Sequence, residues 1–467
     1  MTRLVAFARN PLAIAGAVIA TTSGVVFIVL AIALVAGLFD NPYAGLVVGV
    51  AVPAALVFGL VLIPLGMWLE RRKRPRGTDA DWPVVDFRHA SVRRTSFLIV
   101  TLTAVNLGIV LLAGYGSLHW MESPSFCGQV CHTPMRPQFT AWSESSHART
   151  ACVRCHIGEG AAAFVHAKAA GVRQLSHVLT NSYSKPTPPG TDMAMGTQAQ
   201  TCLGCHRPER IASDRIRVIR EYGDDEANTE TMTVLQMYVG AGASSGRSIH
   251  WHADPNIRVE YVSTDDANET IPYVKVTDAN GQVREYVTAD AAEDALRNGT
   301  RRTMDCVDCH NTVGHPIAAT PEQAVDRALA AGHVSRTLPH ARREGVRLMK
   351  ASYASEDEAM QAIDREFRAF YAARNGAVDA QAIDRTVTGL QAVYRRNVFP
   401  DMNVTWGSYP NQRGHITSAG CFRCHDDSHN EKTTGTAISG DCEYCHKQLE
   451  TPAPTQALAT NRSRSTP

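Results

Sequence analysis

Acidic and basic residues nearly cancel in this chain, and aromatic residues are few. The sequence has 46 lysine and arginine residues against 45 aspartate and glutamate residues, for a formal net charge of +1. A balance this close to zero implies no bulk polyelectrolyte partner, so we expect no binding to nucleic acid. Phe, Trp and Tyr make up only 7% of the chain, which indicates little regular apolar core.

No cysteine stands outside a short motif. Five motifs read Cys-x-x-Cys-His, and one reads Cys-x-x-x-Cys-His. In such motifs both thiols form thioethers with a haem, and the histidine binds the iron. The sequence therefore predicts six covalent c-type haems. The cysteine pairs are Cys127 and Cys131, Cys152 and Cys155, Cys202 and Cys205, Cys306 and Cys309, Cys421 and Cys424, and Cys442 and Cys445; the histidines are His132, His156, His206, His310, His425 and His446.

Other interpretations of paired cysteines explain less of the pattern. Zinc sites and thioredoxin-like redox motifs also use Cys-x-x-Cys, but neither accounts for a histidine after every pair. The first motif, with its extra residue between Cys127 and Cys131, departs most from the common spacing. The motifs recur at no fixed period, so they are not units of a solenoid.

Charge is absent from three long stretches near the N-terminus, Pro11–Phe39, Ala44–Leu69 and Thr95–Leu118. Each exceeds the roughly 20 residues that an apolar helix needs to cross a bilayer. Because the first stretch is too long for a signal peptide and two more follow it, we expect an anchor and no cleaved leader.

Basic residues predict the orientation of these spans. The segment between the second and third spans carries eight arginine and lysine residues, whereas Asp40–Tyr43, between the first two, carries none. The positive-inside rule then places the longer segment and the N-terminus in the cytoplasm, with every haem motif on the other side. We expect a bacterial inner-membrane protein with a periplasmic haem domain.

The predicted fold class is mainly α, with three transmembrane helices followed by a haem domain that carries a small β-hairpin insertion. The hairpin is expected at Arg258–Thr264 and Tyr273–Thr288, with a turn at Asn280 and Gly281. Thr320 and Ser355 are expected to cap helices. The predicted divisions are residues 1–120 (membrane domain), 121–210 (haems one to three), 211–300 (β-containing insertion), 301–400 (haem four and helices), 401–450 (haems five and six) and 451–467 (disordered tail).

Each iron needs a second axial ligand, usually His or Met. Histidines close to the motifs or in unusual local settings are the candidates. They are His147, His250, His252, His315, His415 and His429. His250 and His252 have strand spacing and are expected to face one side. For Met135, three residues after His132, the alternatives are ligation of the first iron, cover for its open face, and ordinary core packing.

The segment Glu159–Tyr183 has the periodicity of an amphipathic helix. Val165, Val172 and Leu179 share its apolar face with Lys168. A helix of this kind is expected to lie in a membrane interface. Two roles for the lysine stay open, namely snorkelling to lipid headgroups and contact with a lipid-soluble quinol.

Ser123–Met135, Ser145–His147 and Ala151–His156 resemble the N-terminal haem region of the NapC/NirT family of membrane-anchored quinol dehydrogenases. The resemblance implies that Met135 is the methionine beside the first haem, that His147 reaches a different haem, and that Lys168 belongs to a quinol site. The first motif departs from the family pattern by one residue. The family's acidic quinol-site residue has no counterpart in Ala169–Leu175.

These observations predict a membrane-bound hexahaem cytochrome that oxidises quinol and relays electrons to periplasmic cytochromes or a respiratory complex, in anaerobic or extracellular respiration. One alternative is an electron-relay subunit without its own quinol site. Another is a multihaem reductase, which often has a Cys-x-x-Cys-Lys motif, and the sequence contains none. Expected partners are therefore membrane lipid, the quinol pool and a redox protein.

Overall fold

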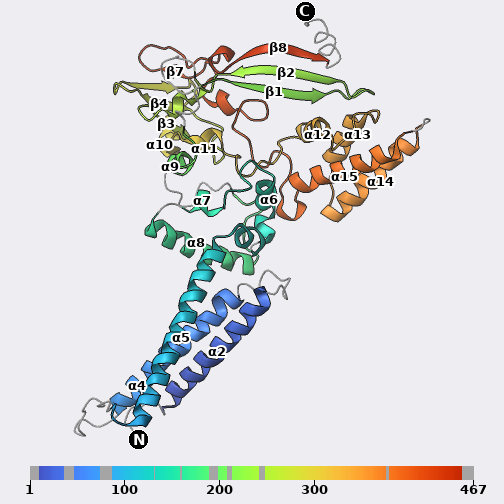
Figure 1. Cartoon of the computed structure of the whole chain (residues 1–467). Coiled ribbons are helices and arrows are strands. Elements are labelled where there is room, and N and C mark those ends of the chain that lie inside the picture. Colours follow the sequence, from blue (N-terminus) through green and yellow to red (C-terminus); the bar gives the residue numbers. More distant parts are fainter. Residues whose placement is uncertain are drawn as a thin grey trace, which may run out of the picture. The chain divides into compact units, whose positions relative to one another are not determined.

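The computed structural model describes residues 10–35, 47–73, 87–130, 132–157, 160–188, 198–207, 213–240, 248–374 and 378–454. The chain divides into two compact units, Met1–His132 and Thr133–Pro467. Figure 1 shows both, with helices in the first unit and helices and two sheets in the second. The first unit continues past the expected end of the membrane domain at residue 120 and includes the first haem motif up to His132.

Three helices of the first unit are long and apolar enough to cross a membrane. They are α2 (Pro11–Val35), α4 (Val52–Lys73), which continues the π-helical turn η1 (Val47–Ala51), and α5 (Ala90–Met121); a second π-helical turn, η2 (Phe126–Val130), follows. Glycines let α2 and α4 pack backbone against backbone, since a Cβ on Gly16 would lie 2.7 Å from the carbonyl oxygen of Gly59. Such contacts are typical of helix pairs in lipid.

The expected three-span anchor is confirmed. The outer face of α5 is apolar, and Phe97 and Leu112 are 74% and 72% exposed, as lipid-facing residues would be. This helix starts at Ala90, before the expected Thr95, and the Arg93 guanidinium in its first turn donates to the carbonyl oxygens of Phe87 and Arg88. Residues 36–46, with the expected loop between the first two spans, lie outside the described residues.

The chain as a whole is mainly helical, as predicted, and the second unit combines helices with strands. Its helices are α6 (His132–Ser143), α7 (Val153–His156), α8 (Ala161–Leu179), α9 (Gln198–Leu203), α10 (Glu293–Asn298), α11 (Cys306–Cys309), α12 (Pro321–Ala330), α13 (Ala341–Lys350), α14 (Glu356–Ala372) and α15 (Ala380–Asn397). Short 3₁₀ turns are η6 (Ile249–Ala253), η7 (Pro400–Met402), η8 (Gly420–Arg423) and η9 (Cys442–Tyr444).

Helices α12 to α15 form a conventional apolar core, which the sequence did not lead us to expect. Val325, Ile363, Phe367 and Leu390 are fully buried there. Aliphatic residues at helical spacing supply this core, so low aromatic content did not preclude it. Both predicted caps are confirmed, since Thr320 accepts a hydrogen bond from the Gln323 amide and Ser355 accepts one from the Glu358 amide.

Two antiparallel sheets replace the single expected hairpin. One has the order β1 (Arg215–Tyr222), β2 (Glu230–Met237), β8 (His446–Pro454); the other has the order β6 (Thr300–Thr303), β3 (Arg258–Ser263), β4 (Tyr273–Thr277), β5 (Val283–Val287), β7 (Asn430–Glu431). The predicted turn at Asn280 and Gly281 is confirmed, because it divides the expected segment Tyr273–Thr288 into β4 and β5. They are joined by a turn in which Gly281 has φ +79° and Asp278 accepts from the amides of Asn280 and Gln282.

The C-terminal region completes both sheets. Residues 451–454 belong to β8, where Thr231 pairs with Pro454 and Met232 with Ala453. They are therefore not part of a disordered tail; residues 455–467 lie outside the described residues. Local sequence could not indicate this pairing, because the partners are more than 200 residues apart.

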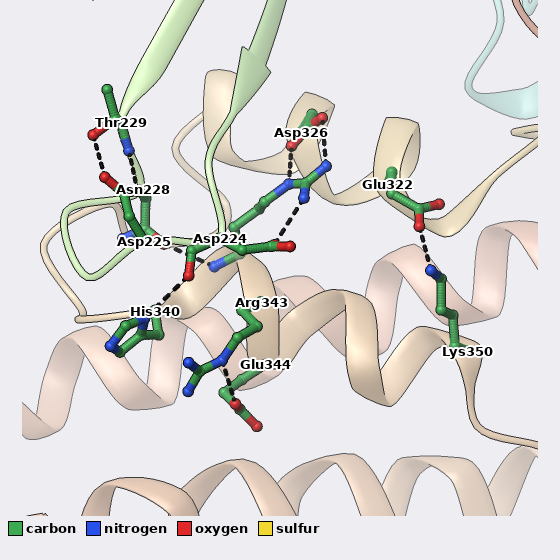
Figure 2. Close-up of polar contacts among 11 residues, drawn as sticks. Asp224, Asp225, Asn228, Thr229, Glu322, Asp326, His340, Arg343, Glu344 and Lys350 are labelled. Atoms are coloured by element: carbon green, nitrogen blue, oxygen red, sulfur yellow. Dashed lines mark hydrogen bonds and ion pairs between the residues drawn. The ribbon is translucent and has the colours of Figure 1, made fainter.

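A polar network fixes the β1–β2 turn to α12 and α13 (Figure 2). The Arg342 guanidinium donates to Asp326 of α12 at 3.0 Å and to Asp224 of the turn at 2.8 Å. Asn228, which is 2% exposed, donates to the carbonyl oxygen of Leu338 and accepts from the Arg342 amide. Since β2 also pairs with β8, the network holds the last haem motif's sheet against the helical core.

Candidate haem centres

Five of the six motif histidines each face a second histidine. The ring centroids lie 5.9–6.4 Å apart in every pair. The pairs are His156 with His315 (6.0 Å), His206 with His147 (6.0 Å), His310 with His250 (6.4 Å), His425 with His252 (5.9 Å) and His446 with His415 (6.2 Å).

This separation suits one metal ion between two imidazoles. A metal–imidazole nitrogen bond is about 2 Å long, so two rings on opposite sides of an ion have centroids about 6 Å apart. Two histidines are one of the ligand sets that hold a low-spin c-type haem. The donor sets of the second to sixth motifs therefore fit six-coordinate haem iron.

The second histidine of a pair comes from a segment outside its partner's motif. His147 precedes the second motif but faces His206 of the third. His315 follows the fourth motif but faces His156 of the second. His415 precedes the fifth motif but faces His446 of the sixth. The ligand pairs thus connect segments that are distant in the sequence.

One 3₁₀ turn serves two motifs. In η6, His250 faces His310 of the fourth motif and His252 faces His425 of the fifth. The expectation that both side chains face one side in a strand is wrong, because the segment is helical and its two imidazoles approach different motifs. Two haems bound there would share one short ligand segment.

Carbonyl groups orient the paired imidazoles. The Nδ1 atoms of His250, His252 and His315 lie 2.9 Å from the carbonyl oxygens of Val239, Ile249 and Gln138, respectively. A carbonyl only accepts, so Nδ1 carries the proton and Nε2 keeps the lone pair that binds iron.

Burial disfavours the charged form of some of the paired histidines. Burial, with a contribution from the facing His315, lowers the pKa of His156 to about 4. Burial likewise lowers the pKa of His315 and of His252. A metal ligand must be the neutral imidazole, so these surroundings favour the ligating form.

Successive motifs are adjacent from the second to the sixth. Helix α9, which carries Cys202, contacts both α7 and α11. Cys202 of the third motif and Cys306 of the fourth are within hydrogen-bonding distance. This hydrogen bond lowers the pKa of Cys202 to about 7. Burial raises the pKa of Cys309 in the fourth motif and of Cys445 in the sixth. The nearby Cys421 of the fifth motif raises both pKa values further, so the fifth motif lies close to both.

A buried arginine joins the fourth and fifth motifs, and the sequence analysis missed it. Arg423, 8% exposed, donates to the carbonyl oxygens of Gly420 (2.8 Å), Asn268 (2.9 Å) and Asp308 (2.7 Å). The Asp308 carboxylate is also buried and accepts a hydrogen bond from Tyr261. Asp308 and Arg423 occupy the same position in their motifs, directly before the second cysteine. These opposite charges at one motif position are the sequence feature that could have indicated a contact between the two motifs.

His429 does not join a pair. It is 1% exposed, and its ring nitrogens lie 2.8 Å from the Asp426 carboxylate and 2.6 Å from the carbonyl oxygen of Ile271. Each ring nitrogen therefore already has a hydrogen-bond partner, so neither faces an open position where an iron could bind. The expected ligand role of His429 is corrected to a structural one.

The first motif is only partly described. Cys127 lies in η2, Cys131 lies outside the described residues, and His132 begins α6 at the boundary between the two units. Met135 lies half-buried in the same helix. Ligation of the first iron by His132, with Met135 as ligand or cover, stays a prediction.

Helix α8 presents its apolar residues outward. Val165, Val172 and Leu179 are 64%, 71% and 78% exposed. Lys168 is half-buried beside this stripe, with its Nζ 5.0 Å from the centre of the Phe164 ring. The helix spans Ala161–Leu179, within the expected segment, and Glu159 lies outside the described residues.

Comparison with known proteins agrees with these features. The model of the NapC/NirT cytochrome c family, N-terminal region, matches residues 90–215. The cytochrome c-type protein ImcH of Geobacter sulfurreducens is 35% identical over 451 residues, which cover 94% of this chain and 88% of the relative. No solved structure matches the chain. The similarity to ImcH extends over the membrane helices and the haem motifs alike.

Proposed function

This chain belongs to the NapC/NirT family of membrane-anchored multihaem cytochromes c, and we propose that it oxidises quinol at the outer face of the inner membrane. In this proposal it carries six covalent haems and delivers electrons to a periplasmic redox partner in anaerobic or extracellular respiration. The bound haems supply one-electron redox chemistry, while the protein positions them and tunes their potentials.

The five opposed histidine pairs are the observation that carries the proposal. They support two histidine ligands for the haem of each motif at Cys152, Cys202, Cys306, Cys421 and Cys442. Saturated coordination favours electron transfer over substrate binding at these irons. A reductase needs an iron with an open position, so the pairs favour a conduit.

Helix α8 and Lys168 support a quinol site. An exposed apolar stripe is unfavourable in water and stable in a membrane interface. A quinol in that interface would meet the Lys168 ammonium, which can donate to a quinol oxygen. The Lys168 ammonium lies close enough to the Phe164 ring for a cation–π interaction. This interaction holds the positive charge at the border of the apolar face.

Replacement of Lys168 tests the site. We expect Lys168→Ala, reconstituted in lipid nanodiscs, to slow quinol-driven haem reduction about tenfold or more, the value of one lost charged hydrogen bond. Dithionite reduction and the absorption spectrum should not change. Gln174→Ala, an exposed polar change on the same helix, is the matched control.

Two outcomes would redirect the proposal. If Lys168→Ala reduces its haems at the wild-type rate, the lysine serves only lipid headgroups. If the wild-type protein accepts electrons from a partner complex but not from quinol, the chain is a relay subunit.

A further inference from the structure

Three arginines from separate elements lie within electrostatic range of one another. They are Arg217 of β1, Arg327 of α12, and Arg413 in the loop before the fifth motif. Within the described residues none of the three has an ion-pair partner, although the adjacent Arg396 pairs with Glu144 at 2.7 Å. Burial, together with Arg396, Arg217 and Arg413, lowers the pKa of Arg327.

Two of these cations line a cleft next to a motif histidine. The cleft has a volume of about 360 Å³, and its wall includes Arg327, Arg413, Gln323, Asn411 and His310. His310 is the histidine of the fourth haem motif and faces His250. The cationic groups therefore share a cleft with the imidazole of that motif.

Positive charges at close range repel one another, which costs free energy. Partial burial of the guanidinium groups adds a desolvation cost. A bound anion removes this cost. The planar guanidinium matches a carboxylate with two parallel N–H donors, and arginine is the common choice for holding such groups. A c-type haem attached through its vinyl groups keeps two propionate carboxylates free for such contacts.

We infer that Arg327 and Arg413 bind the propionate carboxylates of the haem attached at Cys306 and Cys309. The inference rests on the proposed haem attachment at that motif, but not on quinol oxidation. The two guanidinium groups keep the propionates ionised and offset their charge near the iron. Arg217 adds a third positive charge to the same cluster.

Spectroelectrochemistry of the full-length holoprotein tests this site. Arg327→Met and Arg413→Met remove the positive charge. Arg327→Lys and Arg413→Lys keep the charge but lack the two parallel N–H donors of the guanidinium. The control is Arg365→Met, the same charge change on the exposed side of α14. Midpoint potentials are recorded between pH 5.5 and 8.5. Charged groups near the cleft besides the propionates are His310, Arg217 and the Arg396–Glu144 pair.

We expect each methionine variant to lower the midpoint potential of one haem and to make that potential pH-dependent, because a released propionate titrates near neutrality. The lysine variants should show a smaller change, and Arg365→Met none. A shift without new pH dependence, or no shift, would overturn the inference. A wild-type potential that responds to inorganic phosphate at constant ionic strength would also overturn it, since the cleft would then hold a soluble anion.

The same samples separate this inference from the proposed function. A pyridine haemochrome assay counts the attached haems in every variant. A protein that has its haems but does not oxidise quinol would refute the proposed activity and leave the propionate contacts intact. Loss of haem from the fourth motif in the wild-type protein would remove the basis of the inference itself.

Discussion

Two histidines that the sequence treats alike have opposite surroundings. His315 and His429 both follow a motif histidine closely, five and four residues later. In the structure His315 faces His156, and its Nδ1 atom makes the hydrogen bond to a carbonyl oxygen, so that Nε2 is available. In His429 both ring nitrogens make hydrogen bonds. Only the first can bind iron.

We therefore expect His315→Ala to give one high-spin haem out of the full set, seen by electron paramagnetic resonance and visible spectroscopy. His429→Ala should leave the spin state of every haem as in the wild type and lower the free energy of unfolding by about 1–3 kcal/mol, since it leaves buried acceptors unpaired. An unchanged low-spin spectrum in His315→Ala, or a high-spin haem in His429→Ala, would contradict the assignment.

Arg423 is a second residue whose role depends on burial. Its guanidinium bonds three carbonyl groups from both sides of the junction between the fourth and fifth motifs. We expect Arg423→Met to reduce the free energy of unfolding by about 3 kcal/mol, because three buried acceptors lose their donor. The conservative Arg423→Lys should lose less. Thermal unfolding followed at the haem absorption band measures both, and equal stability of wild type and Arg423→Met would refute the role.

Motif chemistry identifies the cysteines and motif histidines from sequence, but ligand pairing is a property of the fold. The sequence singled out His147, His315 and His415, yet each lies next to a motif that it does not serve. Proximity in sequence misleads here because opposite faces of a haem are met by different segments. Arg423 and Asp308 escaped notice because burial, not residue type, makes them important.

At the scale of elements, periodic segments were predicted well and long-range strands were not. The amphipathic pattern located α8 to within a few residues, since it depends only on local spacing. Strand β7 pairs with β5 and β8 pairs with β2, at sequence separations of about 145 and about 215 residues, and no local pattern indicates those partners. The helical core of α12 to α15 was overlooked because a haem protein was expected to need little of one.

The η6 turn allows a separate test, because within five residues it places one histidine opposite His310 and another opposite His425. His250→Ala should convert one haem to high spin and His252→Ala a different one, distinguishable by their midpoint potentials. The double variant should show two high-spin haems. Trp251→Phe, which keeps both imidazoles, is the control. If both single variants affected the same haem, the assignment of η6 to the fourth and fifth motifs would be wrong.

For the whole molecule, membrane topology and haem chemistry constrain each other. The basic segment between the second and third spans predicts that this segment is cytoplasmic and that the haem motifs are periplasmic. The six motifs consume all twelve cysteines, so the holoprotein should have no free thiol. A single introduced cysteine can therefore report its own side of the membrane.

We expect Thr433→Cys, exposed in the loop after β7, to react with a membrane-impermeant maleimide added to intact spheroplasts. Thr78→Cys, in the segment between α4 and α5, should react only after the membrane is permeabilised. The wild-type holoprotein is the control and should stay unlabelled. Labelling of Thr78→Cys in intact spheroplasts would invert the topology and place the haem motifs in the cytoplasm. Labelling of the wild-type protein would instead show that a motif has not attached its haem, and the Cys127 motif, with its extra residue, is the first to examine.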